Sequence, residues 1–164
     1  MFDRALRLYA RSVVRDVPLP KPFSVQALCR ELAVRSGRRI YLHPYPPEIG
    51  GEDMPCGVWV ATAGADHIFF ERNTSEYHQR HIIMHEIAHM LCRHTVHDLA
   101  DSMPEVHSLV AGRPQGALLR TSYTTRQERE AELVASMILE RVMVWDSNTA
   151  TAGERYFGEV LGFG

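Results

Sequence analysis

The segment His-Glu-Ile-Ala-His at residues 85–89 constrains this chain more than any other feature. It falls within a stretch, about 77–95, whose apolar residues recur at helical spacing and predict a helix. Those apolar residues are Ile82, Ile83, Ile87, Met90 and Leu91. Because residues four apart share a helix face, His85 and His89 can reach the same metal ion. The alternative is a helix with two chance surface histidines, and the apolar pattern favours the metal site.

The residue between the two histidines indicates hydrolytic chemistry. Glu86 lies one step round the helix and can reach a water molecule on a metal ion held by His85 and His89. Zinc lowers the pKa of such a water to about 7, so a nearby carboxylate can take its proton at neutral pH. The motif therefore predicts a site for one zinc ion, with Glu86 as the general base.

A catalytic zinc site needs a third protein ligand, and the closest candidate in the sequence is unsuitable. His94 follows His89 by five residues. On a regular helix this spacing turns the two side chains about 140° apart. We therefore expect His94 and His97 to lie at the end of the helix, near its C-terminal dipole.

A second acidic segment offers a better ligand. Glu128 and Glu132 lie four apart at the start of a helix predicted over 126–145. One carboxylate can bind the ion while the other hydrogen-bonds a ligand imidazole from behind, and Glu128 is the expected ligand. Glu130 lies on another face, where it should pair with an arginine or meet solvent. The alternative is a solvated first turn with favourable dipole charges.

The expected fold class is α+β. A small antiparallel β-sheet of about three strands should pack against the motif helix and the second, Glu-bearing helix, as in a zincin. The whole chain, 1–164, should form one domain with a core over about 25–142. The other expected elements are helices over 2–17 and 25–36, a strand at 40–43, a hairpin of 57–62 and 67–71, a poorly patterned connection over 97–123, and a tail over 146–164 with a short helix at 153–161.

Composition narrows the class of protein. Lys and Arg total 18 and Asp and Glu total 20, so we expect no nucleic-acid partner. No stretch approaches the roughly 18 apolar residues that cross a membrane, and the charged N-terminal sequence is not a secretory signal. Three widely spaced cysteines without a CxxC pair indicate a reducing compartment, so the expected location is cytoplasmic.

Two motifs together resemble the ImmA/IrrE family of zinc metallopeptidases. The first is His-Glu-Ile-Ala-His-Met-Leu-Cys-Arg-His at 85–94, and the second is Glu-Arg-Glu-Ala-Glu-Leu-Val-Ala at 128–135. The resemblance implies that Glu128 binds zinc and that Glu132 supports a ligand from behind. Val134 stands where that family usually has Phe, so the chain is a divergent match. The resemblance also implies a protein substrate, a helix-turn-helix repressor with a DNA-binding domain.

Other roles stay open at the level of sequence. Tyr123 precedes the second helix and can donate a hydrogen bond to the oxyanion that develops during hydrolysis, or it is an ordinary partly buried tyrosine. Two functions compete with a repressor-cutting peptidase. One is a catalytically silent zincin-fold module that sequesters a partner. The other is a toxin-like peptidase held inactive by a partner, with 97–123 as its gate.

Overall fold

The computed structural model describes residues 3–47, 55–62, 64–94, 118–120 and 123–161, the backbone alone for 118–120 and 148–161. Helices and strands alternate irregularly along the chain, which confirms the predicted α+β class. The elements are α1 (Arg4–Arg15), α2 (Val25–Ser36), β1 (Arg39–Pro44), β2 (Gly57–Ala61), β3 (Ala65–Phe70), α3 (Glu76–Leu91), β4 (Leu118–Arg120) and α5 (Thr125–Leu161).

The sheet is mixed and has four strands in the order β1-β3-β2-β4. β2 and β3 form the predicted antiparallel hairpin, and the sheet is small, as expected. β1 pairs with β3 in parallel, so the expectation that all its strands are antiparallel was wrong. β3 lies between β1 and β2 in the sheet, so β1 and β2 run in opposite directions. β4 pairs with β2 over Trp59 to Ala61. The sequence predicted a poorly patterned connection over 97–123, of which 97–117 and 121–122 lie outside the described residues.

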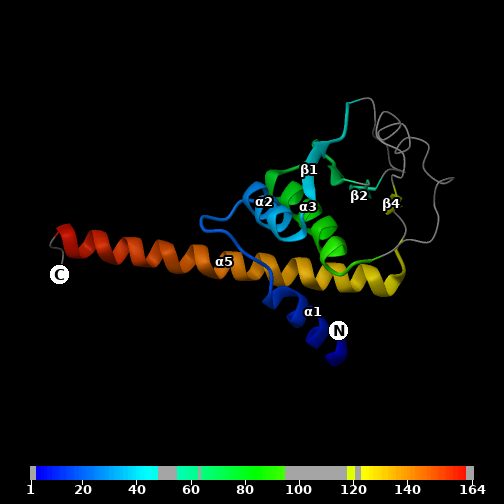
Figure 1. Cartoon of the computed structure of the whole chain (residues 1–164). Coiled ribbons are helices and arrows are strands. Elements are labelled where there is room, and N and C mark those ends of the chain that lie inside the picture. Colours follow the sequence, from blue (N-terminus) through cyan, green and yellow to red (C-terminus); the bar gives the residue numbers. More distant parts are fainter. Residues whose placement is uncertain (1–2, 48–54, 63, 95–117, 121–122, 162–164) are drawn as a thin grey trace.

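Helices cover one face of the sheet. Trp59, Ile68 and Phe70 alternate with residues of the opposite face and belong to the core shared with the helices. α3 packs on β2 and β3, α2 packs on β1, and α5 packs against α3 on the side away from the sheet (Figure 1). The motif helix is thus the middle layer of the fold, between the sheet and α5.

Helix α3 ends earlier than the sequence predicted. Ser75 caps its start by accepting a hydrogen bond from the backbone N–H of His78. The last helical residue is Leu91, and Arg93 adopts a left-handed backbone conformation with φ of 54°. The N–H of His94 then donates to the carbonyl of His89 at 3.1 Å, so the chain turns back on the helix.

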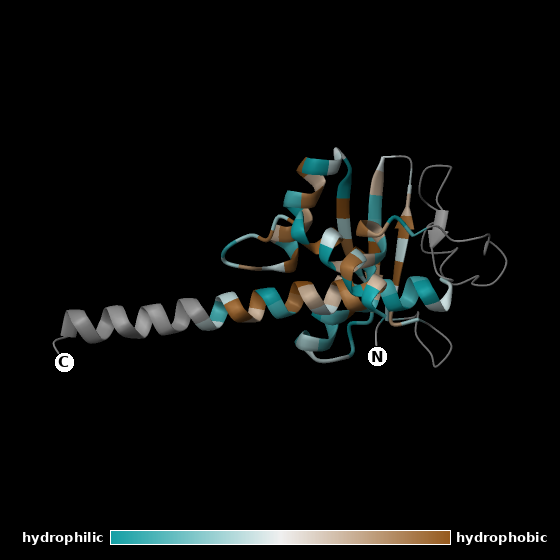
Figure 2. Ribbon diagram, turned by 90° about the horizontal axis from the view of Figure 1, so that it is seen from below, coloured by the Kyte–Doolittle hydropathy of each residue, from teal (hydrophilic) through white to brown (hydrophobic). Residues whose placement is uncertain are grey.

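Helix α5 is longer than expected. It runs without interruption from Thr125 to Leu161, so the helix predicted over 126–145 and the short one over 153–161 are one element, which includes the described part of the segment expected as a tail. Hydrophobic and hydrophilic positions alternate along its first half, which packs on the body of the molecule (Figure 2). The second half extends beyond that body (Figure 1).

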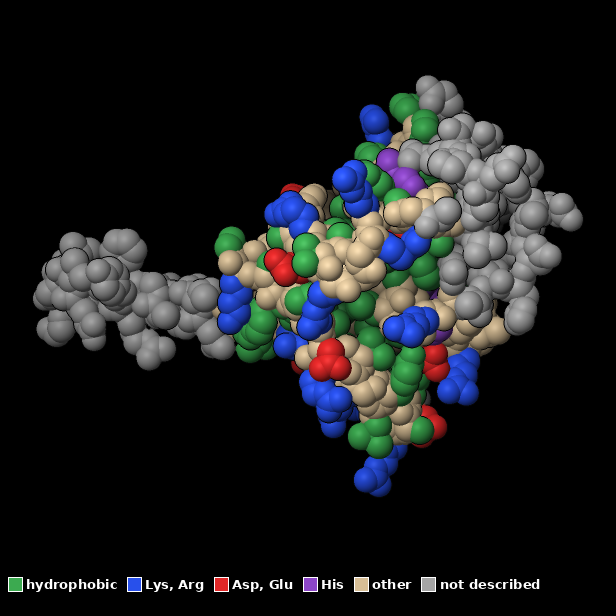
Figure 3. Space-filling model, in the orientation of Figure 1, with side chains coloured by type: hydrophobic (Ala, Val, Ile, Leu, Met, Phe, Trp, Pro, Cys, Tyr) green, Lys and Arg blue, Asp and Glu red, His purple; other side chains and the backbone are tan. Residues whose placement is uncertain are grey.

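Charged residues are spread over the described surface. On the face shown in Figure 3, Lys and Arg side chains lie on several elements, with Asp and Glu side chains between them. In the part of the chain that the structure describes, no helix has the length and apolar character needed to cross a membrane.

A buried carboxylate on β3 links β2 to the residue that precedes β1. Asp66 is 5% exposed and accepts hydrogen bonds from Trp59 Nε1 and Arg38 Nε, both at 2.9 Å. Arg38 also donates to the carbonyls of Thr62 and Ala65, across the hairpin turn. This network ties the start of β1 to the hairpin.

Replacing Asp66 with Ala should therefore destabilise the protein. Loss of a buried, hydrogen-bonded ion pair costs about 3–5 kcal/mol, and we expect about 2–3 kcal/mol because the Arg38 side chain is 35% exposed. Urea unfolding measures the change. Asp16→Ala is the control, since its side chain is 75% exposed and should shift the free energy of unfolding by less than about 0.5 kcal/mol. Equal effects of the two substitutions would contradict the proposed role of Asp66.

Candidate metal centre

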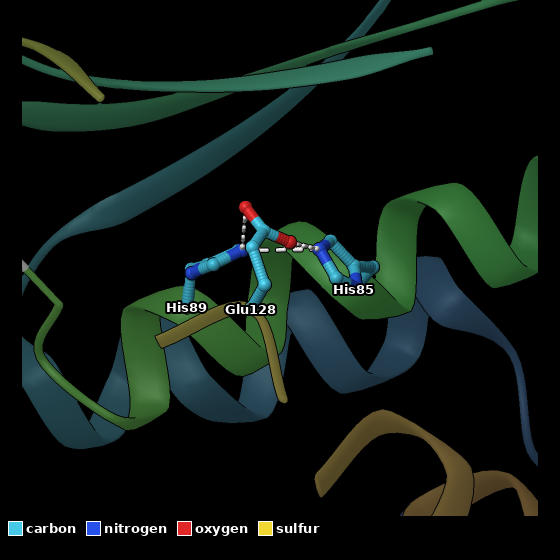
Figure 4. Close-up of side chains that lie close together, drawn as sticks. All are labelled: His85, His89 and Glu128. Atoms are coloured by element: carbon cyan, nitrogen blue, oxygen red, sulfur yellow. Dashed lines mark hydrogen bonds and ion pairs between the residues drawn. The ribbon is translucent and has the colours of Figure 1, made fainter. Parts of the chain in front are cut away.

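Two imidazole nitrogens from α3 and the carboxylate of Glu128 from α5 lie close together, with each carboxylate oxygen facing a different imidazole (Figure 4). His85 Nε2 lies 3.0 Å from Glu128 Oε2 and 3.0 Å from His89 Nε2. Glu128 Oε1 lies 3.7 Å from His89 Nε2. His85, His89 and Glu128 are the residues predicted as metal ligands, and they form the cluster that can hold a metal ion among the described residues.

The antiparallel packing of α3 against α5 produces this convergence. His85 of α3 contacts Glu128 of α5. His81, one turn earlier on α3, lies 3.5 Å from Glu132, which is one turn later on α5. Apolar side chains hold the two helices in this register, including the fully buried Met84, Ile87, Val134 and Ile138. Each helix therefore presents its ligands at the same level.

The spacing of these atoms fits a tetrahedral metal ion. Ligand atoms placed about 2.0–2.1 Å from zinc at tetrahedral angles lie about 3.3–3.4 Å apart. The two imidazole nitrogens lie 3.0 Å apart, and each carboxylate oxygen of Glu128 lies beside a different one of them, Oε2 at 3.0 Å and Oε1 at 3.7 Å, distances close to this value. Two imidazoles and one carboxylate are also a donor set that zinc accepts in catalytic sites.

Glu86 is buried beside the cluster. Its side chain is 6% exposed, and its Oε2 atom has no hydrogen-bond partner among the described residues. Gly57 of β2 makes room for it, because a Cβ added at Gly57 would lie 2.9 Å from Glu86 Oε1 and 2.7 Å from Ile82 Cγ2. A small cavity of about 210 Å³ is lined by Glu86, by the three candidate ligands and by Pro55, Cys56, Gly57 and Tyr123. The carboxylate and the candidate ligands therefore share one cavity.

Burial changes the acidity of Glu86. Desolvation raises the pKa of this carboxyl from 4.5 to about 7, against the opposing effects of His85 and of a backbone hydrogen bond with Trp59. A carboxyl with a pKa near 7 can both take and return a proton at neutral pH, which is the property that a general base and acid requires.

The pKa values of the candidate ligands shift in different directions in the metal-free protein. The hydrogen bond from His85, together with the nearby imidazole of His89, lowers the pKa of Glu128 to about 2, so this carboxyl is ionised. Burial lowers the pKa of His89, which favours a neutral imidazole. Burial would also lower the pKa of His85, but the hydrogen bond to Glu128 and nearby carboxylates outweigh it and raise the pKa. The ionised carboxylate of Glu128 therefore lies beside an imidazole whose protonated form it favours.

Glu132 lies where the sequence predicted it. Its Oε2 is 3.4 Å from His85 Nδ1, on the side of the ring away from Glu128, and its Oε1 accepts a hydrogen bond from Ser136 at 3.4 Å. A carboxylate in this place favours the imidazole form that carries its proton on Nδ1 and leaves Nε2 bare for a metal ion.

Two residues near the site lie in places that the sequence did not predict. His94, expected at the end of the helix near its C-terminal dipole, is 4% exposed and folds back so that its Nδ1 lies 2.8 Å from His89 Nδ1. Glu130 pairs with Arg126, as expected of an arginine partner, but it is 8% exposed and also lies 2.9 Å from His94 Nε2. The left-handed turn at Arg93 brings His94 here, and helical periodicity alone gives no signal of it.

Tyr123 lies in the cavity, against a candidate ligand. Its ring stacks on the His89 imidazole with a centroid separation of 3.5 Å and an interplanar angle of 12°. The ring therefore forms a wall that holds the plane of His89. Donation by its hydroxyl to an oxyanion stays a prediction. Arg120, a weaker candidate for the same task, lies on β4, opposite Trp59.

Comparisons of the chain with known protein families, with curated proteins and with solved structures find no significant match.

The buried Glu86 should make the stability of the metal-free protein depend on pH. The folded protein holds the Glu86 proton up to about pH 7, whereas the unfolded chain releases it near 4.5. This contribution to the free energy of unfolding is therefore present below pH 4.5 and is lost as pH rises to about 7, a change of up to about 3 kcal/mol.

The measurement is urea unfolding of the chelator-treated wild type and of Glu86→Gln at pH 5 and pH 8. Because Gln does not titrate, the variant should gain stability relative to the wild type as pH rises. Since both proteins contain the same other titrating groups, the difference between them isolates Glu86. Parallel pH profiles would show that the buried carboxyl is not protonated in the folded protein.

Proposed function

We propose that this protein is a zinc-dependent metalloendopeptidase. One observation carries the proposal: the donor atoms of His85, His89 and Glu128 converge in the same cavity that holds the buried carboxylate of Glu86. A site that only binds metal does not need a carboxylate buried beside its ligands, since burial of that group opposes folding whenever the group is charged. Its presence favours catalysis over a silent binding module.

The proposed roles follow from the positions of the side chains. His85, His89 and Glu128 hold the metal, and Tyr123 and Glu132 orient the two imidazoles. A bound zinc ion would polarise the scissile carbonyl and acidify a water molecule. Glu86 takes the proton of that water on its carboxylate and delivers it to the leaving amine. Burial raises the pKa of Glu86 in the metal-free protein, and a bound cation would lower it, which favours the carboxylate form that accepts the proton.

The resemblance to the ImmA/IrrE family supports the proposed substrate class. Its members typically cut a helix-turn-helix repressor, so the proposed partner is a repressor with a DNA-binding domain, in the cytoplasm. The ligand set matches residue by residue: the zinc-binding Glu of the family pattern falls on Glu128, which here reaches both histidines.

Metal binding should depend on Glu128. We expect the purified wild type to hold about one zinc ion, and Glu128→Gln to weaken its affinity for zinc at least about 100-fold, because a neutral amide is a poor metal ligand. Competition with a chromophoric chelator measures the affinity. Glu140→Gln, an exposed position on the same helix, is the matched control and should leave affinity unchanged. Equal affinities in the two variants would exclude Glu128 as a ligand.

Peptide hydrolysis should depend on Glu86, whereas zinc binding should not. Glu86→Gln should keep its zinc and lose at least about 100-fold in kcat, since a general base contributes about 10²–10⁴-fold. Cleavage is followed by mass spectrometry on a peptide library and on a helix-turn-helix repressor encoded beside the gene. A variant that relieves repression as the wild type does would show that sequestration, and not cleavage, is the function.

A further inference from the structure

A series of buried hydrogen bonds leads away from His89 on the side opposite the candidate metal position. His89 Nδ1 lies 2.8 Å from His94 Nδ1, and His94 Nε2 lies 2.9 Å from Glu130 Oε2. Glu130 Oε1 accepts a hydrogen bond from Arg126 Nε at 2.8 Å. We call His89, His94 and Glu130 the histidine relay. All three are buried, with exposures of 0%, 4% and 8%.

The direction of the hydrogen bonds is set from the Glu130 end. The guanidinium of Arg126 is always charged and only donates, so Glu130 is a paired carboxylate that only accepts. His94 must then donate from Nε2. A neutral His94 has its lone pair on Nδ1 and accepts there. His89 therefore donates from Nδ1.

This direction leaves the metal-facing nitrogen of His89 without a proton. A neutral imidazole carries one N–H, so a proton on Nδ1 means a lone pair on Nε2. That Nε2 atom is the one that lies 3.0 Å from His85 Nε2, within the metal cluster. Only in this tautomer can His89 bind a metal ion without first moving a proton.

We propose that His94 is a positioning residue, which fixes the metal-binding tautomer and ring orientation of His89 by connecting it to the Glu130 carboxylate. The inference deepens the proposed function and rests on it for the identity of the metal. His85 has a carboxylate directly behind it, since Glu132 Oε2 lies 3.4 Å from its Nδ1. His89 reaches a carboxylate through His94, which the turn at Arg93 places in between.

The relay also joins the two helices that build the site. Glu130 stands two residues after the candidate ligand Glu128, in the first turns of α5. Helix α5, which supplies the candidate ligand Glu128, thus also sets the tautomer of the candidate ligand His89. Tyr123, immediately before that helix, stacks on the face of His89, and the relay holds the edge of the same ring.

The first test uses the zinc-free full-length wild type and requires no variant. Two-dimensional ¹H–¹⁵N NMR of the imidazole rings at pH 8 distinguishes the tautomers of histidine. The expected result is a His89 that is protonated on Nδ1 and bare on Nε2, with a neutral His94 protonated on Nε2. A His89 protonated on Nε2, or a doubly protonated His94, would overturn the proposal.

The second test reverses the relay. In Glu130→Gln the amide oxygen can accept from Arg126 while its NH₂ group faces His94, so His94 must accept on Nε2 and donate from Nδ1. His89 should then switch to the tautomer protonated on Nε2. Affinity for zinc, measured by chelator competition, should fall about 10–100-fold, the usual cost of changing the partner behind a ligand. Glu140→Gln makes the same chemical change at an exposed position and should change neither quantity.

The outcomes separate the two proposals. If Glu130→Gln has the same His89 tautomer and the same zinc affinity as Glu140→Gln, the proposed role of His94 is overturned. A wild type that binds no zinc contradicts the proposed function, while the NMR spectra of the zinc-free proteins still decide the relay. If Glu130→Gln does not fold, His94→Gln replaces it, with the same expected loss of zinc affinity. A purely structural role for His94 would lower stability without switching the tautomer of His89.

Discussion

The antiparallel contact between α3 and α5 is the interaction on which the rest of the site depends. Fully buried apolar side chains fix the register of the two helices, and the polar residues above them follow from that register. Because the two helices run antiparallel, Glu128 contacts His85, and Glu132, one turn later on α5, contacts His81, one turn earlier on α3. The sheet contributes less directly, by supplying Gly57, whose missing side chain leaves space for Glu86.

Much of this arrangement is predictable from local sequence. The spacing of His85, Glu86 and His89 on an apolar helix predicts which residues share a face, and the four-residue spacing of Glu128 and Glu132 predicts a second such face. Helix boundaries set by Ser24 and Gly37 are also local, and α2 has the predicted bounds. Periodicity succeeds where the backbone stays regular.

Prediction fails where the backbone departs from regularity. Helical periodicity turned His94 away from the site, whereas the left-handed turn at Arg93, a residue type with no preference for that conformation, brings it back. The parallel pairing of β1 with β3 depends on the path of the intervening chain, about which a strand's own residues say nothing. Burial of Glu130 likewise depends on the partner that this turn delivers.

The candidate ligands on α3 and α5 are close in space and distant along the chain, since His85 and Glu128 are 43 positions apart. An ion bound by both would act as a cross-link, closing a long loop much as a disulfide does and lowering the chain entropy of the unfolded state. Since the unfolded chain contains no assembled site, occupancy and folding would be thermodynamically linked. Metal supply would then control how much folded protein a cell contains, as well as how active each molecule is.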